Sequence, residues 1–210
     1  MVPHAANDEE LQLPPSCRKR TNNLKTTRNK QVIVGADFAG FPLKEAIKRH
    51  LIERGWSITD LTPVQNDAPM YHRVGFLVGS RISEREFEKG LLFCGSGMGI
   101  HIAASKCPHV HAAVCESVVT ARRAATANNA NVLAMGAFYT APRLGMAMAD
   151  AFLESSLGDG YEDWEGFSDY HRVGFDECES FDYDSYKANG FEVIDPKHAH
   201  LGSEPRGLAF

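Results

Sequence analysis

Short apolar runs alternate with amphipathic stretches along residues 31–153 of the chain. The apolar runs lie at 31–35, 57–61, 91–94, 111–115 and 131–135, and their length and content predict buried strands. The stretches between them predict helices at about 41–54, 73–89, 118–127 and 142–153, with a further helix from about residue 98. Five apolar strands that alternate with helices predict an α/β fold in three layers, with a five-stranded parallel sheet and helices on both faces.

The same pattern divides the chain into three segments. Residues 1–30 have little apolar patterning and more basic than acidic side chains, which predicts a flexible N-terminal extension. Residues 31–155 carry the alternating elements and form the α/β domain. Glycines, aromatic residues and acids then replace the pattern, so residues 156–210 are expected to form a C-terminal extension that packs on the domain or on a dimer partner.

Composition excludes several classes of function. The chain has 210 residues, a 43% hydrophobic fraction and a formal net charge of -5, which argues against a general nucleic-acid binder. No apolar run approaches the ~20 residues that a membrane span needs. The cysteines are 5 in number, widely spaced and without a Cys-x-x-Cys pair, which favours a reducing cytoplasm over disulfides or a zinc site.

The stretch from Leu91 to Ile100 carries the main candidate chemistry. An apolar strand ends at Cys94, and the sequence Gly-Ser-Gly-Met-Gly follows it over 95–99. Glycines at Gly95, Gly97 and Gly99 expose backbone N–H groups, including that of Met98, which attract anions or a developing oxyanion. Cys94 is either a small inert core residue or a reactive thiol beside these donors, and we favour the second interpretation.

In a parallel sheet the carboxyl ends of the strands form the usual ligand edge, and Asp37 and Cys94 both fall there. Asp37 is either a helix cap or a carboxylate that contacts the substrate and moves a proton. Ser96 is either a turn residue or a hydroxyl for the same substrate. Asn128 is either an ordinary helix-ending residue or a ligand for a substrate hydroxyl.

Two other kinds of site are rejected. The spacing Gly-x-Gly-x-Gly follows the third predicted strand, whereas a dinucleotide fingerprint is Gly-x-Gly-x-x-Gly on the first, so no nicotinamide cofactor is expected. The scattered histidines, including His198 and His200, do not form a set of metal ligands, so no metal is expected either.

One hexapeptide occurs twice, at Tyr71–Phe76 and at Tyr170–Phe175, each time as Tyr-His-Arg-Val-Gly-Phe. Two short copies do not establish a repeat architecture, and chance is the simplest explanation. The alternative is that both supply a His-Arg pair to one anionic pocket. On that alternative Tyr71, Arg73, His171 and Arg172 are candidate substrate contacts.

The assembled motifs resemble the ribose-5-phosphate isomerase B and galactose-6-phosphate isomerase (RpiB/LacAB) family. The resemblance rests on Gly-Ala-Asp-Phe-Ala-Gly at 35–40, Cys-Gly-Ser-Gly-Met-Gly at 94–99 and Asn-Asn-Ala-Asn-Val-Leu-Ala-Met-Gly at 128–136. It implies a Rossmann-like fold, an aldose-ketose isomerase without a cofactor, and a homodimer or dimer of dimers whose sites lie between subunits. It also implies that Cys94 moves a proton between C1 and C2 through a cis-enediolate, that Ser96 handles hydroxyl protons and that Asp37 contacts the sugar.

The chain departs from the family pattern at several cationic positions. Phe38 replaces a histidine, Ala127 replaces the ring-opening histidine, Phe138 replaces an arginine, and of two final arginines only Arg172 remains, with Ser168 in place of the other. A phosphate dianion prefers several charge-assisted donors. We therefore expect a sugar or sugar phosphate other than ribose 5-phosphate as substrate. The alternative is a non-catalytic sugar-binding or regulatory protein on the same fold.

Overall fold

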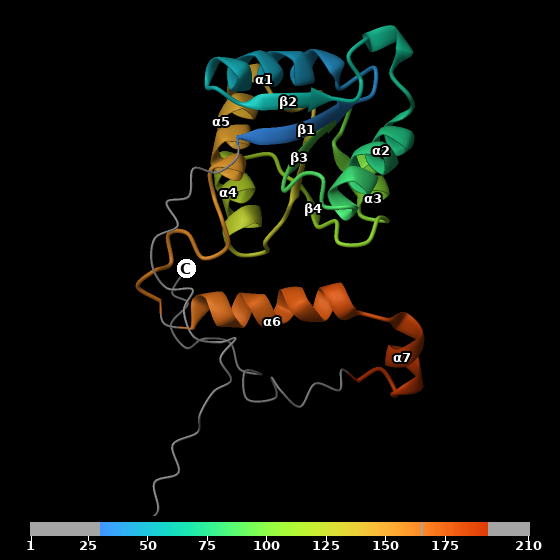
Figure 1. Ribbon diagram of the computed structural model, residues 1–210, viewed down its shortest axis with the longest axis vertical. Coiled ribbons are helices and arrows are strands. Elements are labelled where there is room, and N and C mark those ends of the chain that lie inside the picture. Colours follow the sequence, from blue (N-terminus) through green and yellow to red (C-terminus); the bar gives the residue numbers. More distant parts are fainter. Residues whose placement is uncertain (1–29, 165, 193–210) are drawn as a thin grey trace, which may run out of the picture. The chain divides into compact units, whose positions relative to one another are not determined.

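The computed structural model describes residues 30–164 and 166–192 (Figure 1). The strands are β1 (Gln31–Ala36), β2 (Ser57–Asp60), β3 (Gly90–Cys94), β4 (Ala112–Val114) and β5 (Val132–Gly136). The helices are α1 (Phe41–Glu53), η2 (Gln65–Asp67), α2 (Tyr71–Ser83), α3 (Met98–Ala104), α4 (Val118–Thr126), α5 (Pro142–Leu153), α6 (Phe167–Ser180) and α7 (Tyr183–Ala188). The predicted flexible extension, residues 1–30, lies outside the described residues apart from Lys30.

The strands form one five-stranded sheet in the order β2-β1-β3-β5-β4, and neighbouring strands within the described residues pair in parallel. Side chains alternate between its faces, because successive residues of a strand point in opposite directions. Val32 and Val34 pack with α1, α4 and α5, whereas Ile33 packs with α2 and α3. The three-layer, Rossmann-like fold predicted from the apolar runs is confirmed.

Parallel strands place their carboxyl ends at one edge of the sheet, and each following helix returns the chain to the other edge. The loops after β1, β3 and β5 therefore meet at the carboxyl edge. Helix α4 follows β4 and runs back, so the residues between α4 and β5 lie at the amino edge. This difference in position governs which candidate residues can meet within one chain.

The predicted helix over 73–89 differs from the observed α2 at both ends. Helix α2 begins earlier than predicted, at Tyr71, and also ends earlier, at Ser83. Arg85 has a positive φ of 59°, a left-handed conformation that stops a helix. The strand after it starts at Gly90, where β1 and β5 both pair with β3.

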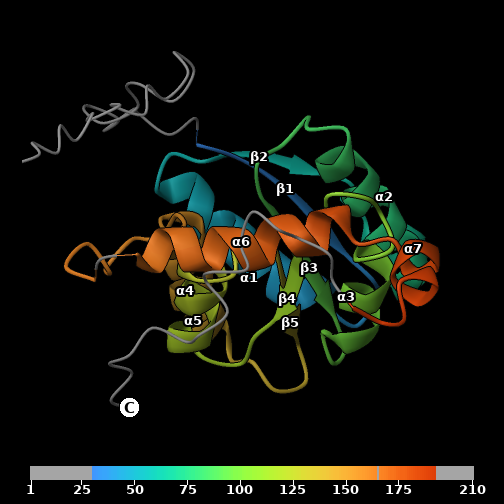
Figure 2. The ribbon, with the colours of Figure 1, turned by 90° about the horizontal axis from the view of Figure 1, so that it is seen from below.

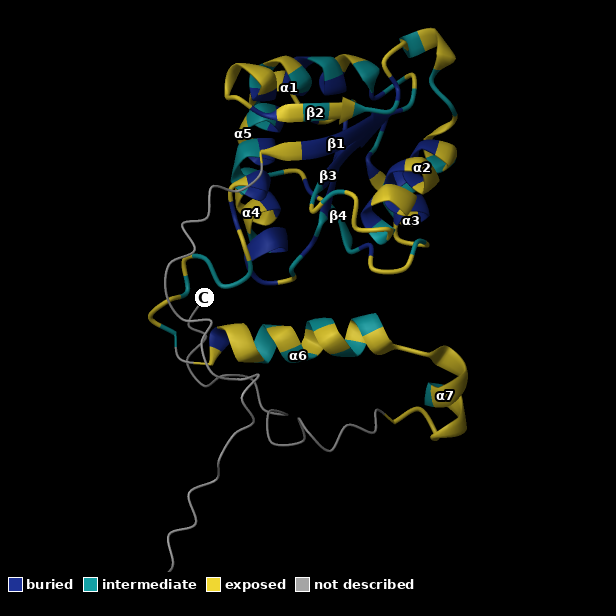
Figure 3. Cartoon of the chain, in the orientation of Figure 1, coloured by how far each residue is buried: buried dark blue, intermediate teal, exposed yellow. Residues whose placement is uncertain are grey.

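The C-terminal segment contains two helices that the hydrophobic pattern does not reveal. In α6 only Phe167 is buried among the described residues, so the helix has no continuous apolar stripe (Figure 3). Figures 1 and 2 place α6 beside β4, the edge strand of the sheet. Its contacts with the domain include hydrogen bonds of Glu179 to His109 and His111. No helix within the described ranges is long and apolar enough to cross a membrane.

Candidate active site

Cys94 ends β3 and is 4% exposed, so its thiol lies at the floor of the carboxyl edge. The backbone N–H of Gly97 donates a hydrogen bond to Sγ of Cys94 over 3.0 Å. The N–H of Met98 lies 3.3 Å from Oγ of Ser96, which turns the serine hydroxyl back onto its own loop. The loop thus folds around the thiol and brings donors, a hydroxyl and sulfur together.

The close approach of other chain segments explains the glycine at two loop positions. Gly97 has φ +79°, a left-handed conformation, and a Cβ there would lie 3.0 Å from the backbone nitrogen of Gly136. At Gly95 a Cβ would lie 2.5 Å from the ring of Phe138. The loop is therefore packed between the end of β5 and an aromatic ring, and side chains there would force it to move.

Asp37 reaches the same edge because the loop after β1 packs directly on β3. A Cβ at Gly40 would lie 2.3 Å from the carbonyl of Phe93, and the N–H of Asp37 donates to that oxygen over 3.1 Å. Oδ1 of Asp37 accepts a hydrogen bond from the Gly40 N–H at 2.8 Å. The carboxylate therefore holds its own loop, but Gly40 is the N-cap of α1 and no side chain caps this helix, so Asp37 is not a helix cap. Its other oxygen makes no hydrogen bond to the described residues.

Exposed apolar side chains surround this edge. Phe38 is 61% exposed, Tyr71 41%, Met98 49% and Phe138 71%. The rings of Tyr71 and Phe138 pack against Gly99 and Gly95, so they border the loop at both of its ends. The structure brings these four residues together with the catalytic candidates Asp37, Cys94 and Ser96.

Asn128 lies elsewhere in the fold. It precedes β5, whose first residue, Val132, pairs with Gly90, whereas Cys94 pairs with Gly136 at the far end of the same ladder. At ~3.3 Å per strand residue, the two ends are roughly 13 Å apart. Asn128 and Cys94 of one chain therefore lie at opposite edges of the sheet.

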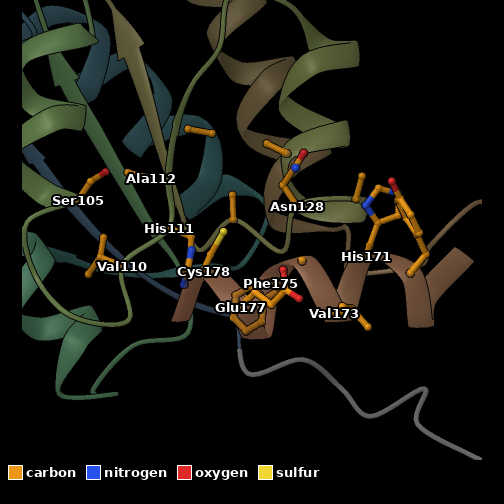
Figure 4. Close-up of a pocket in the computed structure, with 16 residues that line it drawn as sticks. Ser105, Val110, His111, Ala112, Asn128, His171, Val173, Phe175, Glu177 and Cys178 are labelled. Carbon is orange, nitrogen blue, oxygen red and sulfur yellow. The ribbon is translucent and has the colours of Figure 1, made fainter. Parts of the chain in front are cut away.

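A cavity of 810 Å³ is lined by Asn128 and by residues of α6. Figure 4 shows Asn128 facing this space together with His171 and Cys178 of α6. Burial, followed by the charge of Arg123, lowers the pKa of His171 below its ordinary value. The amide of Asn128 and the imidazole of His171 thus line the same cavity, and the lowered pKa of His171 favours its neutral form.

The remaining candidates are on two different helices. Arg73 projects from α2 into a groove with Phe76 and Leu77. Arg172 is exposed on α6, next to His171 in sequence. The two Tyr-His-Arg hexapeptides therefore supply their basic residues to different parts of the chain, and the described residues show no single pocket that holds both pairs.

Two residues that sequence reasoning missed contact the backbone of the candidate site. Oγ1 of Thr62 accepts a hydrogen bond from the Ala36 N–H at 2.8 Å, and Nε2 of Gln65 donates to the Phe38 carbonyl at 3.0 Å. Both follow β2, which ends at the same edge as β1 and β3. The polar residues after β2 were the signal available in the sequence. No group of three or more His, Cys, Asp or Glu side chains suited to a metal occurs in the described part of the chain.

Known proteins are similar to this chain in sequence. The family model described as Ribose/Galactose Isomerase matches residues 32–166. The 4-deoxy-4-sulfo-D-erythrose isomerase of Clostridium sp. (strain MSTE9) is 36% identical over 135 residues, which are 64% of this chain and 85% of that protein. The D-erythrulose-4-phosphate isomerase of Pectobacterium atrosepticum is 32% identical over 130 residues, 61% of this chain and 86% of that protein.

A solved structure agrees in fold. Ribose-5-phosphate isomerase B of Clostridium thermocellum superposes with a TM-score of 0.64 at 28% identity and covers 76% of this chain and 99% of its own. These matches confirm the resemblance inferred from the motifs. The family match ends at residue 166, just before α6, so the correspondence of Ser168 and Arg172 with the two final arginines of the family stays a prediction.

Proposed function

The chain belongs to the ribose/galactose isomerase family and is an aldose-ketose isomerase, and from that premise we propose that its substrate is a tetrose with an anionic group on C4. The observation that carries the proposed chemistry is the Cys94 thiol, buried at the end of β3 and hydrogen-bonded by the Gly97 N–H. A single base on one side of the substrate and oxyanion donors on the other are what proton abstraction beside a carbonyl requires.

In the proposed reaction the thiolate of Cys94 removes the proton from C2 of the aldose. The electrons of that C–H bond form the C1–C2 double bond of a cis-enediolate, whose oxygens face the N–H groups of residues 95–99. Cys94 then returns the proton to C1, while the proton of the C2 hydroxyl passes to the C1 oxygen. Ser96 moves this hydroxyl proton, and Asp37 accepts a hydrogen bond from a sugar hydroxyl and fixes its position.

The tetrose follows from what the site lacks. A pentose 5-phosphate closes into a furanose, which must open before its carbonyl can react, and Ala127 stands where the family has a ring-opening histidine. An aldotetrose can form a five-membered ring only through its C4 oxygen. Phosphorylation of that oxygen, or its replacement by a sulfonate, prevents ring closure, so no ring-opening acid is needed.

Two relatives support this choice of chain length. Their names specify 4-deoxy-4-sulfo-D-erythrose and D-erythrulose 4-phosphate, and both sugars have four carbons and an anionic group at C4. The aromatic residues Phe38 and Phe138 narrow the edge of the site, which suits a short substrate. A pentose phosphate is longer by one carbon, and this chain has fewer cationic side chains than the family pattern to bind its phosphate.

We infer that donors from a second subunit bind the far end of the substrate. Asn128 and His171 border one cavity, Arg172 is on the same helix, and all three lie away from the carboxyl edge. In the proposed homodimer the cavity of one subunit faces the glycine loop of the other. Arg172 and Asn128 then bind the anionic group and a hydroxyl across the interface.

Solvent deuterium tests the chemistry. Incubation of D-erythrulose 4-phosphate with the protein in D₂O should place deuterium on C1 of the ketose and C2 of the aldose. Cys94→Ala should abolish this uptake. Thermal stabilisation by the sugar without deuterium uptake would instead identify a sugar-binding protein that has lost catalysis.

A further inference from the structure

Lys44 is a fully buried charge close to the candidate site. Its side chain is 0% exposed, and Nζ lies 2.9 Å from each carboxylate oxygen of Asp60 at the end of β2. Nζ also donates to the carbonyl of Thr62 and lies 4.1 Å from the centre of the Phe41 ring. A buried lysine is costly unless it is paired. Phe41 and Glu45, the latter 3.2 Å from Nζ, belong to α1 itself, whereas Asp60 and Thr62 belong to the end of β2 and the chain segment that follows it.

Thr62 transmits this contact to the catalytic edge. Its carbonyl is held by Lys44, its N–H donates to Oδ1 of Asp60 at 3.0 Å, and its hydroxyl accepts from the Ala36 N–H at 2.8 Å. Ala36 is the last residue of β1 and directly precedes Asp37. Asp37 therefore directly follows the residue whose backbone N–H Thr62 holds.

The same segment supports the loop at a second point. Gln65 donates to the carbonyl of Phe38, one residue beyond Asp37. Farther along, Tyr71 begins α2, and its ring packs on Gly99 of the glycine loop. The chain from Thr62 to Tyr71 thus touches both loops of the site, and Lys44 holds its first residue.

We propose that Lys44 is a positioning residue of the isomerase, which acts through Thr62 to hold Asp37 against the substrate. This inference rests on the proposed function, because it assigns a purpose to the substrate contact of Asp37. Lys44 itself does not touch the reacting atoms. Replacement of a buried ion pair by apolar side chains is often neutral for stability. We therefore assign Lys44 a role in positioning Thr62 rather than a role in stability.

Lys48 provides a matched control. It is on the same helix, and its Nζ lies 2.6 Å from Oδ2 of the same Asp60. Its contacts are with Asp60 and Glu45, whereas Thr62 contacts Lys44, Asp60 and Ala36. Lys48→Met removes a charge from Asp60 and leaves the Thr62 carbonyl bound to Lys44. Lys44→Met releases the Thr62 carbonyl and leaves both Asp60 paired with Lys48 and the Thr62 N–H bound to Asp60.

The test compares kcat/KM for these two variants at a temperature where circular dichroism shows both folded. Lys44→Met should lower kcat/KM by about tenfold or more, and Lys48→Met should change it by less than about twofold. Thr62→Val should reproduce the loss, since it removes the hydroxyl at nearly constant volume, and Thr62→Ser should retain activity. Equal losses in Lys44→Met and Lys48→Met would overturn the proposal.

A double-mutant cycle separates positioning from general destabilisation. If Lys44 acts through Asp37, Lys44→Met should have an effect below about twofold in an Asp37→Asn background. An undiminished tenfold loss in that background contradicts the proposal.

Amide exchange keeps the inference testable if the wild-type protein isomerises none of the sugars offered, which would refute the proposed function alone. The Ala36 amide should exchange slowly in the wild type and in Lys48→Met, and at least about tenfold faster in Lys44→Met. Equal protection of this amide in all three proteins would refute the positioning role.

Discussion

The N–H of Gly97 donates a hydrogen bond to Sγ of Cys94 over 3.0 Å. One residue thus connects the two halves of the proposed chemistry, since Gly97 belongs to the loop whose amides face the enediolate and also contacts the base. Gly97 has a left-handed backbone, at φ +79°, so the chain turns sharply at the residue that makes this contact. The position of the thiol and the shape of the loop are therefore linked.

Cys94→Ala should lower kcat by roughly 10²–10⁴-fold, because it removes the proposed base of the proton transfer. Cys115→Ala is the control. Burial, opposed by a hydrogen bond with Thr120, raises the pKa of the Cys115 thiol, so it should stay protonated and inert. Steady-state turnover of both variants provides the measurement, and normal activity of Cys94→Ala would remove the cysteine from the mechanism.

Gly97→Ala should lose both stability and activity. Alanine in a left-handed conformation costs about 1 kcal/mol, and its Cβ would also press on the Gly136 nitrogen at 3.0 Å. Gly55 has φ +81° with nothing within 4 Å of a built Cβ, so Gly55→Ala isolates the backbone cost. Urea unfolding should show the smaller loss for Gly55→Ala, and assays should show full activity for that variant only.

Asp60 should make stability depend on acid pH. Burial opposes the shift, but hydrogen bonds from Lys48, Lys44 and the Thr62 amide lower the pKa of Asp60 below its ordinary value of 3.8. The unfolded chain therefore takes up the proton first as the pH falls, and the stabilising contribution of the carboxylate is present above the unfolded value and lost below it.

The unfolding free energies of wild type and Asp60→Asn measure this effect. Their difference should be constant at neutral pH and should shrink below about pH 4. A difference that stays unchanged down to about pH 3 would contradict the assigned ion pair.

The proposed active site, shared between two subunits, predicts recovery of activity in mixed dimers. Cys94→Ala lacks the base, and the double variant Asn128→Ala with Arg172→Ala lacks the donors at the far end. If these groups act across the interface, a mixed dimer has one site with every defect and one intact site. Refolding the two inactive proteins together in equal amounts should restore about one quarter of wild-type activity. No recovery would place all the groups in one chain.

Much of the fold was predictable because apolar runs identify buried parallel strands without long-range information. The carboxyl edge followed from strand order, so Asp37 and Cys94 were correctly expected at the same edge. Helix α6 was not predictable in the same way, since only Phe167 is buried along it. Its contacts depend on Glu179, which meets two histidines far away in the sequence.

The contacts that support the site were not predicted from the sequence, for a related reason. Lys44 looks like an ordinary exposed residue of an amphipathic helix, yet it is fully buried by packing against Asp60 and Thr62. The pattern also gave no distance between Asn128 and Cys94. Only the parallel register, with Val132 opposite Gly90, places them at opposite edges of the sheet.

The central claim is that a cysteine-based aldose-ketose isomerase acts here on an open-chain tetrose with an anionic C4 group. Its most direct test is a comparison of kcat/KM for D-erythrulose 4-phosphate, 4-deoxy-4-sulfo-D-erythrose and ribose 5-phosphate with the same wild-type preparation. At least one of the two tetroses should exceed ribose 5-phosphate by about 10²-fold or more, since neither requires ring opening. Equal or faster turnover of ribose 5-phosphate would contradict the proposed substrate.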